Sequence, residues 1–121
     1  MPDELTERII GAAVEVHRHL GPGLLESIYE EALTHELGLR QIKCDRQVAV
    51  DVLYKDIRIH GQRLDLLVEN EVVVEIKSMK SVPEVASAQV LSYLKATGLK
   101  RALLLNFSET RLVNGIKRFS R

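Results

Sequence analysis

The feature that most constrains the fold is a run of alternating apolar residues between positions 64 and 77. It reads Leu-Asp-Leu-Leu-Val-Glu-Asn-Glu-Val-Val-Val-Glu-Ile-Lys, and the Glu-Asn-Glu in its middle is typical of a tight turn. A turn centred on Asn70 places apolar residues opposite one another on one face, in the pairs Leu64–Ile76, Leu66–Val74 and Val68–Val72. A turn shifted by one residue would put the two apolar sets on opposite faces. The segment therefore predicts an antiparallel hairpin in this register.

The rest of the chain predicts helices around a sheet. Apolar side chains at three- and four-residue spacing predict helices over 3–20, 25–37 and 83–97. Period-two patterns predict strands over 47–54, 57–68, 72–77 and 102–106, with a bulge at Gly61 where the apolar parity changes. The tail, 111–121, fits either a strand or a short helix. The order ααβββαβ plus a C-terminal tail predicts an α/β fold with a mixed β-sheet flanked by helices.

Composition is that of an ordinary globular protein. The 121 residues are 45% hydrophobic and 28% charged, which suits a single domain over residues 1–121. No apolar run approaches the ~20 residues of a membrane span, and the start, Met1-Pro2-Asp3-Glu4, lacks the apolar core of an export signal. Cys44 is the only cysteine, which suits a reducing compartment. We therefore expect a cytoplasmic protein with no membrane partner.

Charge is uneven along the chain although its formal sum is zero. The net charge is −5 over residues 1–40, −2 over 41–75 and +7 over 76–121. A basic last third is compatible with an anionic partner such as nucleic acid. Solvated surface charge on a neutral protein explains the same pattern, and charge alone favours that interpretation.

The predicted hairpin register places two acids side by side. Asp65 and Glu75 lie opposite each other on its second face, where like charges destabilise a strand pair. A divalent cation between them would make sense of this, since hard oxygen ligands suit such ions. Lys77 follows Glu75 by two residues and therefore points to the same face. Two acids and a lysine are what metal-assisted phosphodiester hydrolysis needs. A structural salt bridge of Lys77 with either acid is the alternative.

Two of the predicted helices carry further candidates. Glu26 lies in the first turn of the second helix, beside its apolar side on a helical wheel. The helix dipole explains an acid in this turn but not the inward orientation. Gln89 and Tyr93 are four residues apart and share a face of the third helix. Taken alone, a tyrosine packed at the core edge with Gln89 beside it is the simpler interpretation.

The sequence resembles a known family over nearly its whole length. Gly23-Leu24-Leu25-Glu26-Ser27-Ile28-Tyr29 is similar to the signature of the GxxExxY proteins, small domains of the PD-(D/E)XK nuclease superfamily. Asp65 with Glu75-Ile76-Lys77 resembles the core motif of that superfamily, with Leu64 in place of its proline. Gln89-Val90-Leu91-Ser92-Tyr93 resembles the Q-x-x-x-Y element of its RecB-like branch.

The resemblance implies a restriction-endonuclease-like core that binds Mg²⁺ or Mn²⁺ and acts on DNA or RNA. It implies metal binding by Asp65, Glu75 and the Ile76 carbonyl, with Glu26 as a direct or water-mediated ligand. Lys77 would serve the attacking water, and Gln89 and Tyr93 would orient the site or contact the phosphate. The candidate nucleic-acid contacts are Arg63, Lys80 and Tyr29.

Two functional hypotheses remain open. The first is a metal-dependent nuclease, favoured because every residue of the motifs is present. The second is a catalytically inactive nuclease-fold module that binds or assists, favoured by the small size and zero net charge. A toxin-like or mobile-element component is a third, which the residues neither favour nor exclude. We also expect a homodimer, because small nuclease domains with a mixed sheet often pair with themselves.

Overall fold

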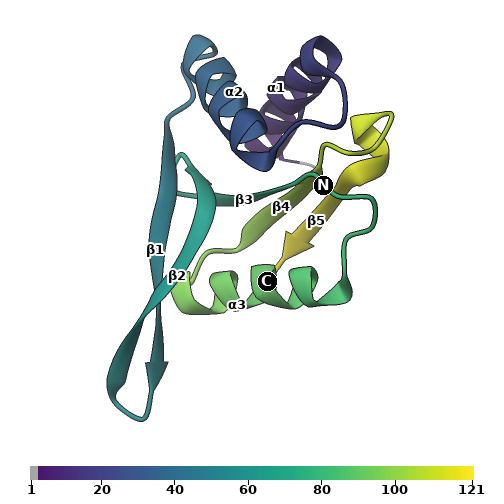
Figure 1. The fold of residues 1–121 in the computed structure, drawn as a ribbon. Coiled ribbons are helices and arrows are strands. Elements are labelled where there is room, and N and C mark those ends of the chain that lie inside the picture. Colours follow the sequence, from purple (N-terminus) through teal and green to yellow (C-terminus); the bar gives the residue numbers. More distant parts are fainter. Residues whose placement is uncertain (1–2) are drawn as a thin grey trace.

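A computed structural model describes residues 3–121 as a five-stranded sheet with helices on both faces (Figure 1). The elements in chain order are α1 (Glu4–Leu20), α2 (Glu26–Leu39), β1 (Cys44–Tyr54), β2 (Ile57–Val68), β3 (Val72–Lys77), α3 (Glu84–Thr97), β4 (Arg101–Asn106), the 3₁₀ helix η1 (Leu112–Gly115) and β5 (Ile116–Ser120). Residues 1 and 2, which belong to the expected domain, lie outside the described residues. The predicted element order is confirmed, and the tail holds both a short helix and a strand.

The sheet is mixed, as predicted, with the strand order β1-β2-β3-β4-β5. β3 and β4 are parallel, and the other neighbouring strands are antiparallel. A parallel pair needs a crossover connection, which α3 supplies across one face of the sheet. α1 and α2 lie over the other face (Figure 1). This arrangement is consistent with the expected restriction-endonuclease-like core.

Two apolar clusters, one on each face, fix the central strand β3. Val72, Val74 and Ile76 pack in the cluster under α1 and α2, whereas Val73 packs in the cluster against α3. Each side chain buried in this way contributes roughly 1.5–3 kcal/mol to folding. Glu75 follows Val73 by two residues and so lies on the α3 side of the sheet. No helix between residues 3 and 121 has the length and apolar character needed to cross a bilayer.

The β2–β3 hairpin has the predicted register but is shorter than expected. Its ladder pairs Leu66, Leu67 and Val68 with Val74, Val73 and Val72. The expected pair of Leu64 with Ile76 is wrong, because Leu64 packs against α3 and Leu66 packs under α1 and α2. The apolar side chains of β2 change faces next to Gln47 of β1. Gln47 lies between the pairs Arg46–Leu66 and Val48–Leu64 and has a left-handed φ of 51°. β2 therefore leaves β3 beside Asp65.

Beyond this point β1 and β2 continue as a two-stranded arm that projects past the body of the protein (Figure 1). The ladder pairs Val50 with Gln62 and then Val52 with Ile59, so one residue of β1 faces two of β2. Gly61 is one of the two, with a φ of 127° that a side chain would rarely adopt. The bulge predicted at Gly61 is confirmed.

Candidate active site

The candidate site lies in the opening between β2 and β3, just past the last ladder pair. Asp65 and Glu75 bridge this opening with their side chains. The Asp65 backbone N–H donates to Glu75 Oε1 at 2.8 Å, and the Ile76 N–H donates to Asp65 Oδ2 at 2.8 Å. The acids come together as predicted, but they are not a ladder pair. Each carboxylate instead takes the place of a backbone carbonyl on the opposite strand.

Glu75 is in an unfavourable place for a negative charge. The residue is only 4% exposed. Burial raises the pKa of Glu75 to about 8, and the charge of Asp65 adds to the rise, while the Asp65 N–H bond and the charge of Lys77 oppose it. A buried carboxylate beside a like charge is typical of functional sites, although structural networks also produce such shifts. A cation in the opening would offset both causes of the raised pKa.

The oxygen atoms around the opening suit a hard divalent cation. Asp65 and Glu75 supply carboxylates from two strands, and the N–H of Ile76 points toward β2. Because the N–H and C=O of one strand residue point to the same side, the Ile76 carbonyl faces the opening as well. Two carboxylates and a carbonyl form an oxygen donor set of the kind that Mg²⁺ and Mn²⁺ prefer.

No third acid joins these ligands. Across residues 3–121, no three side chains of His, Cys, Asp or Glu lie close enough to hold one ion. Mg²⁺ usually keeps several waters and uses one or two protein carboxylates together with substrate oxygens. The donor set of Asp65, Glu75 and Ile76 therefore fits this type of site without a further acid.

Lys77 and Tyr93 lie beside the acid pair. Lys77 is half-buried at the end of β3, and its positive charge acts on Glu75. Tyr93 is 2% exposed, and its hydroxyl donates to the Arg63 carbonyl at 3.1 Å. Burial, followed by the charges of Glu75 and Asp65, raises the pKa of Tyr93 to about 12. Tyr93 thus holds β2 two residues before Asp65. Gln89, one turn earlier on α3, is exposed.

The Gly-Leu-Leu-Glu-Ser-Ile-Tyr segment forms the turn into α2. Gly23 has a φ of 99°, and the Tyr29 hydroxyl donates to the Gly21 carbonyl and accepts from the Leu24 N–H. The Tyr29 ring stacks on Phe107 with its centroid 4.4 Å away. Tyr29 is completely buried, which contradicts its expected contact with nucleic acid. Its role in this structure is to fasten the turn to the core.

Glu26 begins α2, and its carboxylate reaches the end of β3. It is exposed, and its Oε2 accepts a hydrogen bond from the Ser78 N–H at 3.2 Å. Its wheel position, on the face that carries the buried Leu33 and Leu37, agrees with the sequence analysis. Glu26 is nevertheless exposed, because α2 starts at this residue and its first turn lies outside the core. Ser78 directly follows Lys77, so Glu26 lies at the far end of β3 from the hairpin turn.

A buried acid that the sequence analysis missed connects α2 to the acid pair. Glu30 is 8% exposed, and its Oε2 accepts from Arg46 Nε at 3.0 Å. Its Oε1 accepts from Gln47 Nε2 at 2.7 Å, and the same nitrogen lies 3.4 Å from Asp65 Oδ1. Gln47 thus links the two acids. The available signal was that Glu30 lies one turn after Glu26 on the same face of α2.

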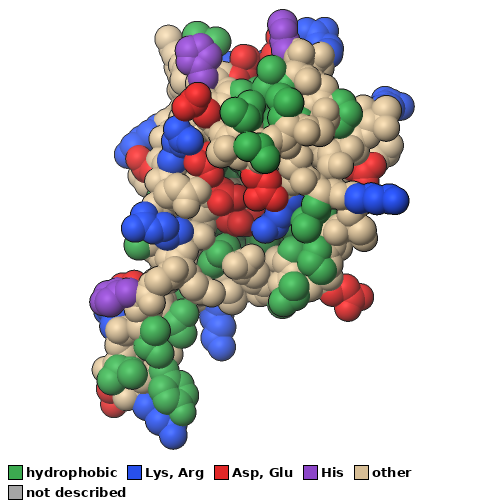
Figure 2. All heavy atoms as spheres, viewed as in Figure 1, with side chains coloured by type: hydrophobic (Ala, Val, Ile, Leu, Met, Phe, Trp, Pro, Cys, Tyr) green, Lys and Arg blue, Asp and Glu red, His purple; other side chains and the backbone are tan. Residues whose placement is uncertain are grey.

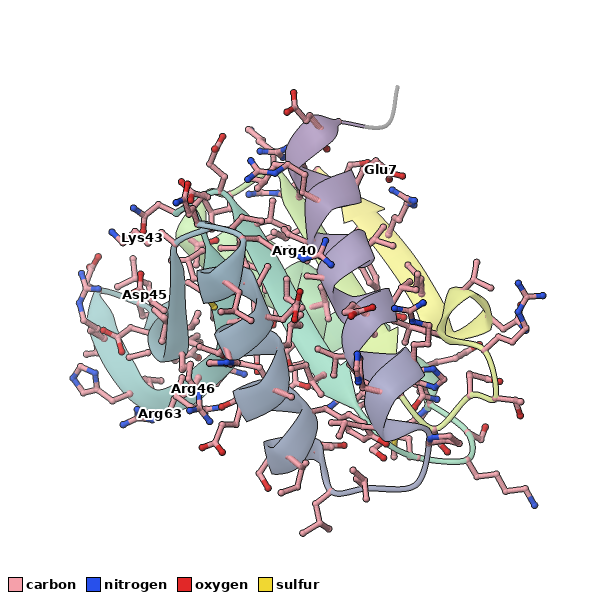
Figure 3. All side chains as sticks on the ribbon, turned by 90° about the horizontal axis from the view of Figure 1, so that it is seen from above. Glu7, Arg40, Lys43, Asp45, Arg46 and Arg63 are labelled. Atoms are coloured by element: carbon pink, nitrogen blue, oxygen red, sulfur yellow. The ribbon has the colours of Figure 1, made fainter. Side chains whose placement is uncertain are left out.

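Two arginines project near this link from neighbouring strands (Figure 3). Arg46 pairs with Glu30, as described above. Arg63 is exposed, and its guanidinium donates to the Gln47 carbonyl at 3.2 Å. Arg63 therefore holds Gln47 in its left-handed conformation, and its positive charge lies on the residue two positions before Asp65. Figure 2 shows acidic side chains next to a basic one on the surface between α2 and α3.

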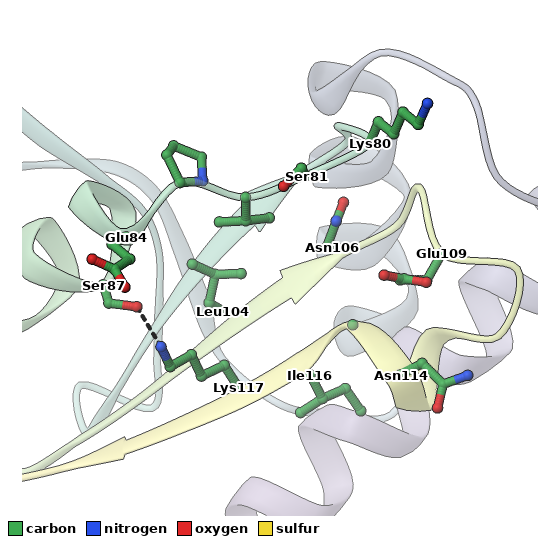
Figure 4. A pocket seen from close by; sticks show the side chains of 13 residues that line it. Lys80, Ser81, Glu84, Ser87, Leu104, Asn106, Glu109, Asn114, Ile116 and Lys117 are labelled. Carbon is green, nitrogen blue, oxygen red and sulfur yellow. Dashed lines mark hydrogen bonds between the residues drawn. The ribbon is translucent and has the colours of Figure 1, made fainter.

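Asn106 holds the loop that follows β3. Its side chain is 4% exposed, its Nδ2 donates to the Met79 carbonyl at 2.9 Å, and its Oδ1 accepts from the Met79 N–H at 3.2 Å. It also lines a cavity of about 430 Å³ between this loop, α3 and β5 (Figure 4). A second hollow, of about 590 Å³, contains Glu26 and Ser78. Lys80 lines both hollows and is exposed, so an anion in either would meet its charge.

Comparison with known proteins agrees with this geometry. Residues 3–119 match a family described as the PD-(D/E)XK nuclease superfamily. Searches of the curated proteins and of the solved structures found no match. Nucleases of this superfamily act on nucleic acid and generally use divalent metals. Because the match covers almost every described residue, the chain belongs to the PD-(D/E)XK nuclease superfamily.

Proposed function

We propose that the chain is a metal-dependent nuclease that hydrolyses phosphodiester bonds in DNA or RNA. The observation that carries this proposal is the opening between β2 and β3. Two carboxylates from different strands meet there with Lys77 beside them, and one of the acids is buried. The two N–H groups of Asp65 and Ile76 need acceptors but not charged ones, and two like charges side by side destabilise a strand pair.

Asp65, Glu75 and the Ile76 carbonyl are the groups that would hold Mg²⁺ or Mn²⁺. When bound, the cation supplies Lewis-acid chemistry, which polarises the phosphate and lowers the pKa of a bound water. Lys77 orients the nucleophilic water and offsets the negative charge that develops on the phosphate. Tyr93 keeps β2 in place, and Gln89 contacts the substrate from the exposed side of α3.

Glu26, Lys80 and Arg63 complete the proposal at the rim of the site. Glu26 acts through water, which is supported by its contact with Ser78, next to Lys77. Lys80 and Arg63 contact the phosphate backbone on the two sides of the acid pair. Both are exposed and cationic, and phosphate contacts of this kind supply most non-specific affinity for nucleic acid.

Within the superfamily, we assign the chain to the GxxExxY proteins of the RecB-like branch. The turn into α2 supports this assignment, because it gives the motif a physical reason. Gly23 adopts a left-handed φ, Glu26 contacts the end of β3, and Tyr29 fastens the turn. Tyr93, the last residue of the Q-x-x-x-Y element, lies at the acid pair. A cytoplasmic location remains a prediction from the sequence.

A catalytically inactive binding or accessory module is the second candidate. One observation favours it: within residues 3–121 no third acid is placed to share one metal ion with the pair. Such a module would bind nucleic acid or a metal without turnover. Cleavage and metal binding must therefore be measured separately.

Metal binding is tested first by thermal unfolding with and without Mg²⁺ or Mn²⁺. We expect either ion to raise the melting temperature, and Asp65→Ala or Glu75→Ala to remove the shift, since ligands that bind only the folded state stabilise it. Glu31→Ala, an exposed acid on α2, should retain the shift. If neither ion changes the melting temperature of the parent protein, this would argue against a metal-dependent nuclease and against an inactive module that binds metal.

Cleavage is tested with end-labelled single-strand, duplex, flap and junction substrates of DNA and RNA. Lys77→Ala should keep the metal-dependent thermal shift and lose cleavage, whereas Lys95→Ala, an exposed lysine on α3, should keep both. Glu75→Ala serves as the blank for contaminating nucleases. A metal shift and nucleic-acid binding without cleavage of any substrate would identify the inactive module instead.

A further inference from the structure

The projecting arm has one apolar face that nothing in the described structure covers. Val52 pairs with Ile59 and Tyr54 with Ile57, so these four side chains lie on the same face. They are 40%, 46%, 56% and 58% exposed, in the order Val52, Ile59, Tyr54, Ile57. Figure 2 shows hydrophobic side chains gathered on the arm. Solvent contact of this extent is costly for a sheet face.

The opposite face of the arm carries charged and polar side chains, with Leu53 as its one large apolar residue. Asp51 accepts a hydrogen bond from His60 Nδ1 at 2.8 Å and lies 3.6 Å from the Arg58 guanidinium. One apolar and one polar face are the pattern of an antiparallel sheet that packs against another layer on one side. The arm therefore has the surface of a packed element, although no layer within residues 3–121 packs on it.

This apolar face continues the one that α3 covers. Val48 and Val50 pack in the cluster with α3, and Val52 and Tyr54 follow at the same two-residue spacing along β1. Figure 1 shows that the arm extends beyond the helix. The arm thus extends a core surface past the last element that buries it, and an exposed apolar patch of this kind often marks an interaction site.

We propose that the missing layer is the arm of a second copy of this chain, packed face to face about a twofold axis. An isologous interface needs a surface that complements itself, which an unbroken apolar face does. The four side chains expose roughly 400 Å² per copy by their fractional exposures. Together with part of the neighbouring Lys55, whose Nζ lies 5.4 Å from the Tyr54 ring centroid, a pair of arms buries about 1,000 Å² in total.

That area defines the kind of dimer formed. Specific interfaces begin near 1,000 Å², and those below about 1,200 Å² are weak and reversible. The dimer should therefore dissociate on dilution. The sequence analysis expects a homodimer, and this inference names the surface through which it would form. The inference does not depend on nuclease activity.

Charge argues against two other occupants of the arm. Asp51, Lys55, Asp56 and Arg58 sum to zero, so the arm lacks the cationic surface that attracts a phosphate backbone. A lipid surface would also favour basic residues around the apolar face. An apolar face on an arm of zero net charge suits another copy of itself better than nucleic acid or an anionic lipid surface.

Sedimentation velocity of the full chain from about 1 µM to about 500 µM tests the proposal. We expect a monomer–dimer equilibrium in this range. Tyr54→Lys and Ile57→Lys should each weaken the dimer at least about tenfold by burying a charge in the interface. Leu53→Lys is the matched control. Leu53 is 68% exposed, on the same strand but paired with Arg58 on the other face, so its replacement should leave the dimer intact.

Circular dichroism should show all three variants folded, because the replaced side chains are exposed. A parent protein that stays monomeric at every concentration would overturn the proposal. So would a dimer that Tyr54→Lys and Ile57→Lys leave unchanged, or one that Leu53→Lys disrupts equally. Binding of duplex oligonucleotide or of anionic vesicles by a monomer, lost in Tyr54→Lys alone, would assign the face to that ligand instead.

Discussion

Replacing Glu75 by glutamine should make the metal-free protein more stable at neutral and alkaline pH. The folded-state pKa of Glu75 is raised from 4.5 to about 8 by burial and by Asp65. Between these two values the folded state binds a proton that the unfolded state has lost, so the free energy of unfolding falls as pH rises through this window. At about 1.4 kcal/mol per pKa unit, the loss by pH 8 is on the order of 4 kcal/mol. Glutamine does not titrate, and its oxygen can still accept the Asp65 N–H.

The assay is thermal unfolding at pH 5 and pH 8 with a chelator present. At pH 5 the parent and Glu75→Gln should melt at similar temperatures, because Glu75 is protonated in the folded state. At pH 8 the variant should melt higher by about 12–20 °C, since 1 kcal/mol shifts the melting temperature of a domain of this size by about 3–5 °C. Glu31→Gln, an exposed control, should show no such difference.

The result that would refute this reasoning is a Glu75→Gln variant less stable than the parent at both pH values. Glu75 would then stabilise the fold as a charged acceptor for the Asp65 N–H, and the opening would be a structural feature. Added Mn²⁺ gives an independent check. It should raise the melting temperature of the parent more at pH 8 than at pH 5, because the cation competes with the proton for Glu75.

Three further predictions concern the fold around the site. Gly115→Ala should lower the free energy of unfolding by about 2 kcal/mol or more in a denaturant titration, because the new Cβ would lie 2.4 Å from the Asn106 carbonyl oxygen. Gly38→Ala in α2 is the control. A Cβ there meets nothing within 4 Å, so this variant should be neutral or stabilising in the same titration. Glu30→Gln should lower the free energy of unfolding by about 1–2 kcal/mol by removing the charge that faces Arg46, and an unchanged urea midpoint would show that the Gln47 link needs no charge. Asp3→Ala should cost about 1 kcal/mol at pH 7, because Asp3 caps α1 through the Thr6 N–H. The pKa of Asp3 is lowered to about 2, chiefly by this bond, so the difference should shrink as pH falls from 3.8 to 2.

The architecture was predictable because its signals are local and repeated. Alternation around Asn70 specified the β2–β3 register, since a slip by one residue would expose every apolar side chain of one strand. The parity change at Gly61 specified the bulge in the arm. Such patterns report which face of an element is buried, and the layers follow from that.

The details of the site depend on single residues that carry no such pattern. Gln47 adopts a left-handed φ that the sequence does not announce, because glycine, asparagine and aspartate are the usual residues there. Gln47 lies next to the point where β2 separates from β3, and its side chain links Glu30 to Asp65. Tyr29 was assigned to the surface because its motif suggested function, yet its burial serves the turn that carries Glu26.

The opening between β2 and β3 shows how folding and function can use the same bonds. Buried N–H groups must find acceptors, and past Leu66 the N–H groups of Asp65 and Ile76 find none in the ladder. The carboxylates of Glu75 and Asp65 satisfy them. An acid at either position is therefore a structural acceptor as well as a candidate ligand, and the Ile76 carbonyl is left facing the gap. It follows that alanine at position 65 removes an acceptor and a ligand together, whereas asparagine keeps the acceptor. The two variants should differ in stability while both lose the metal-dependent shift.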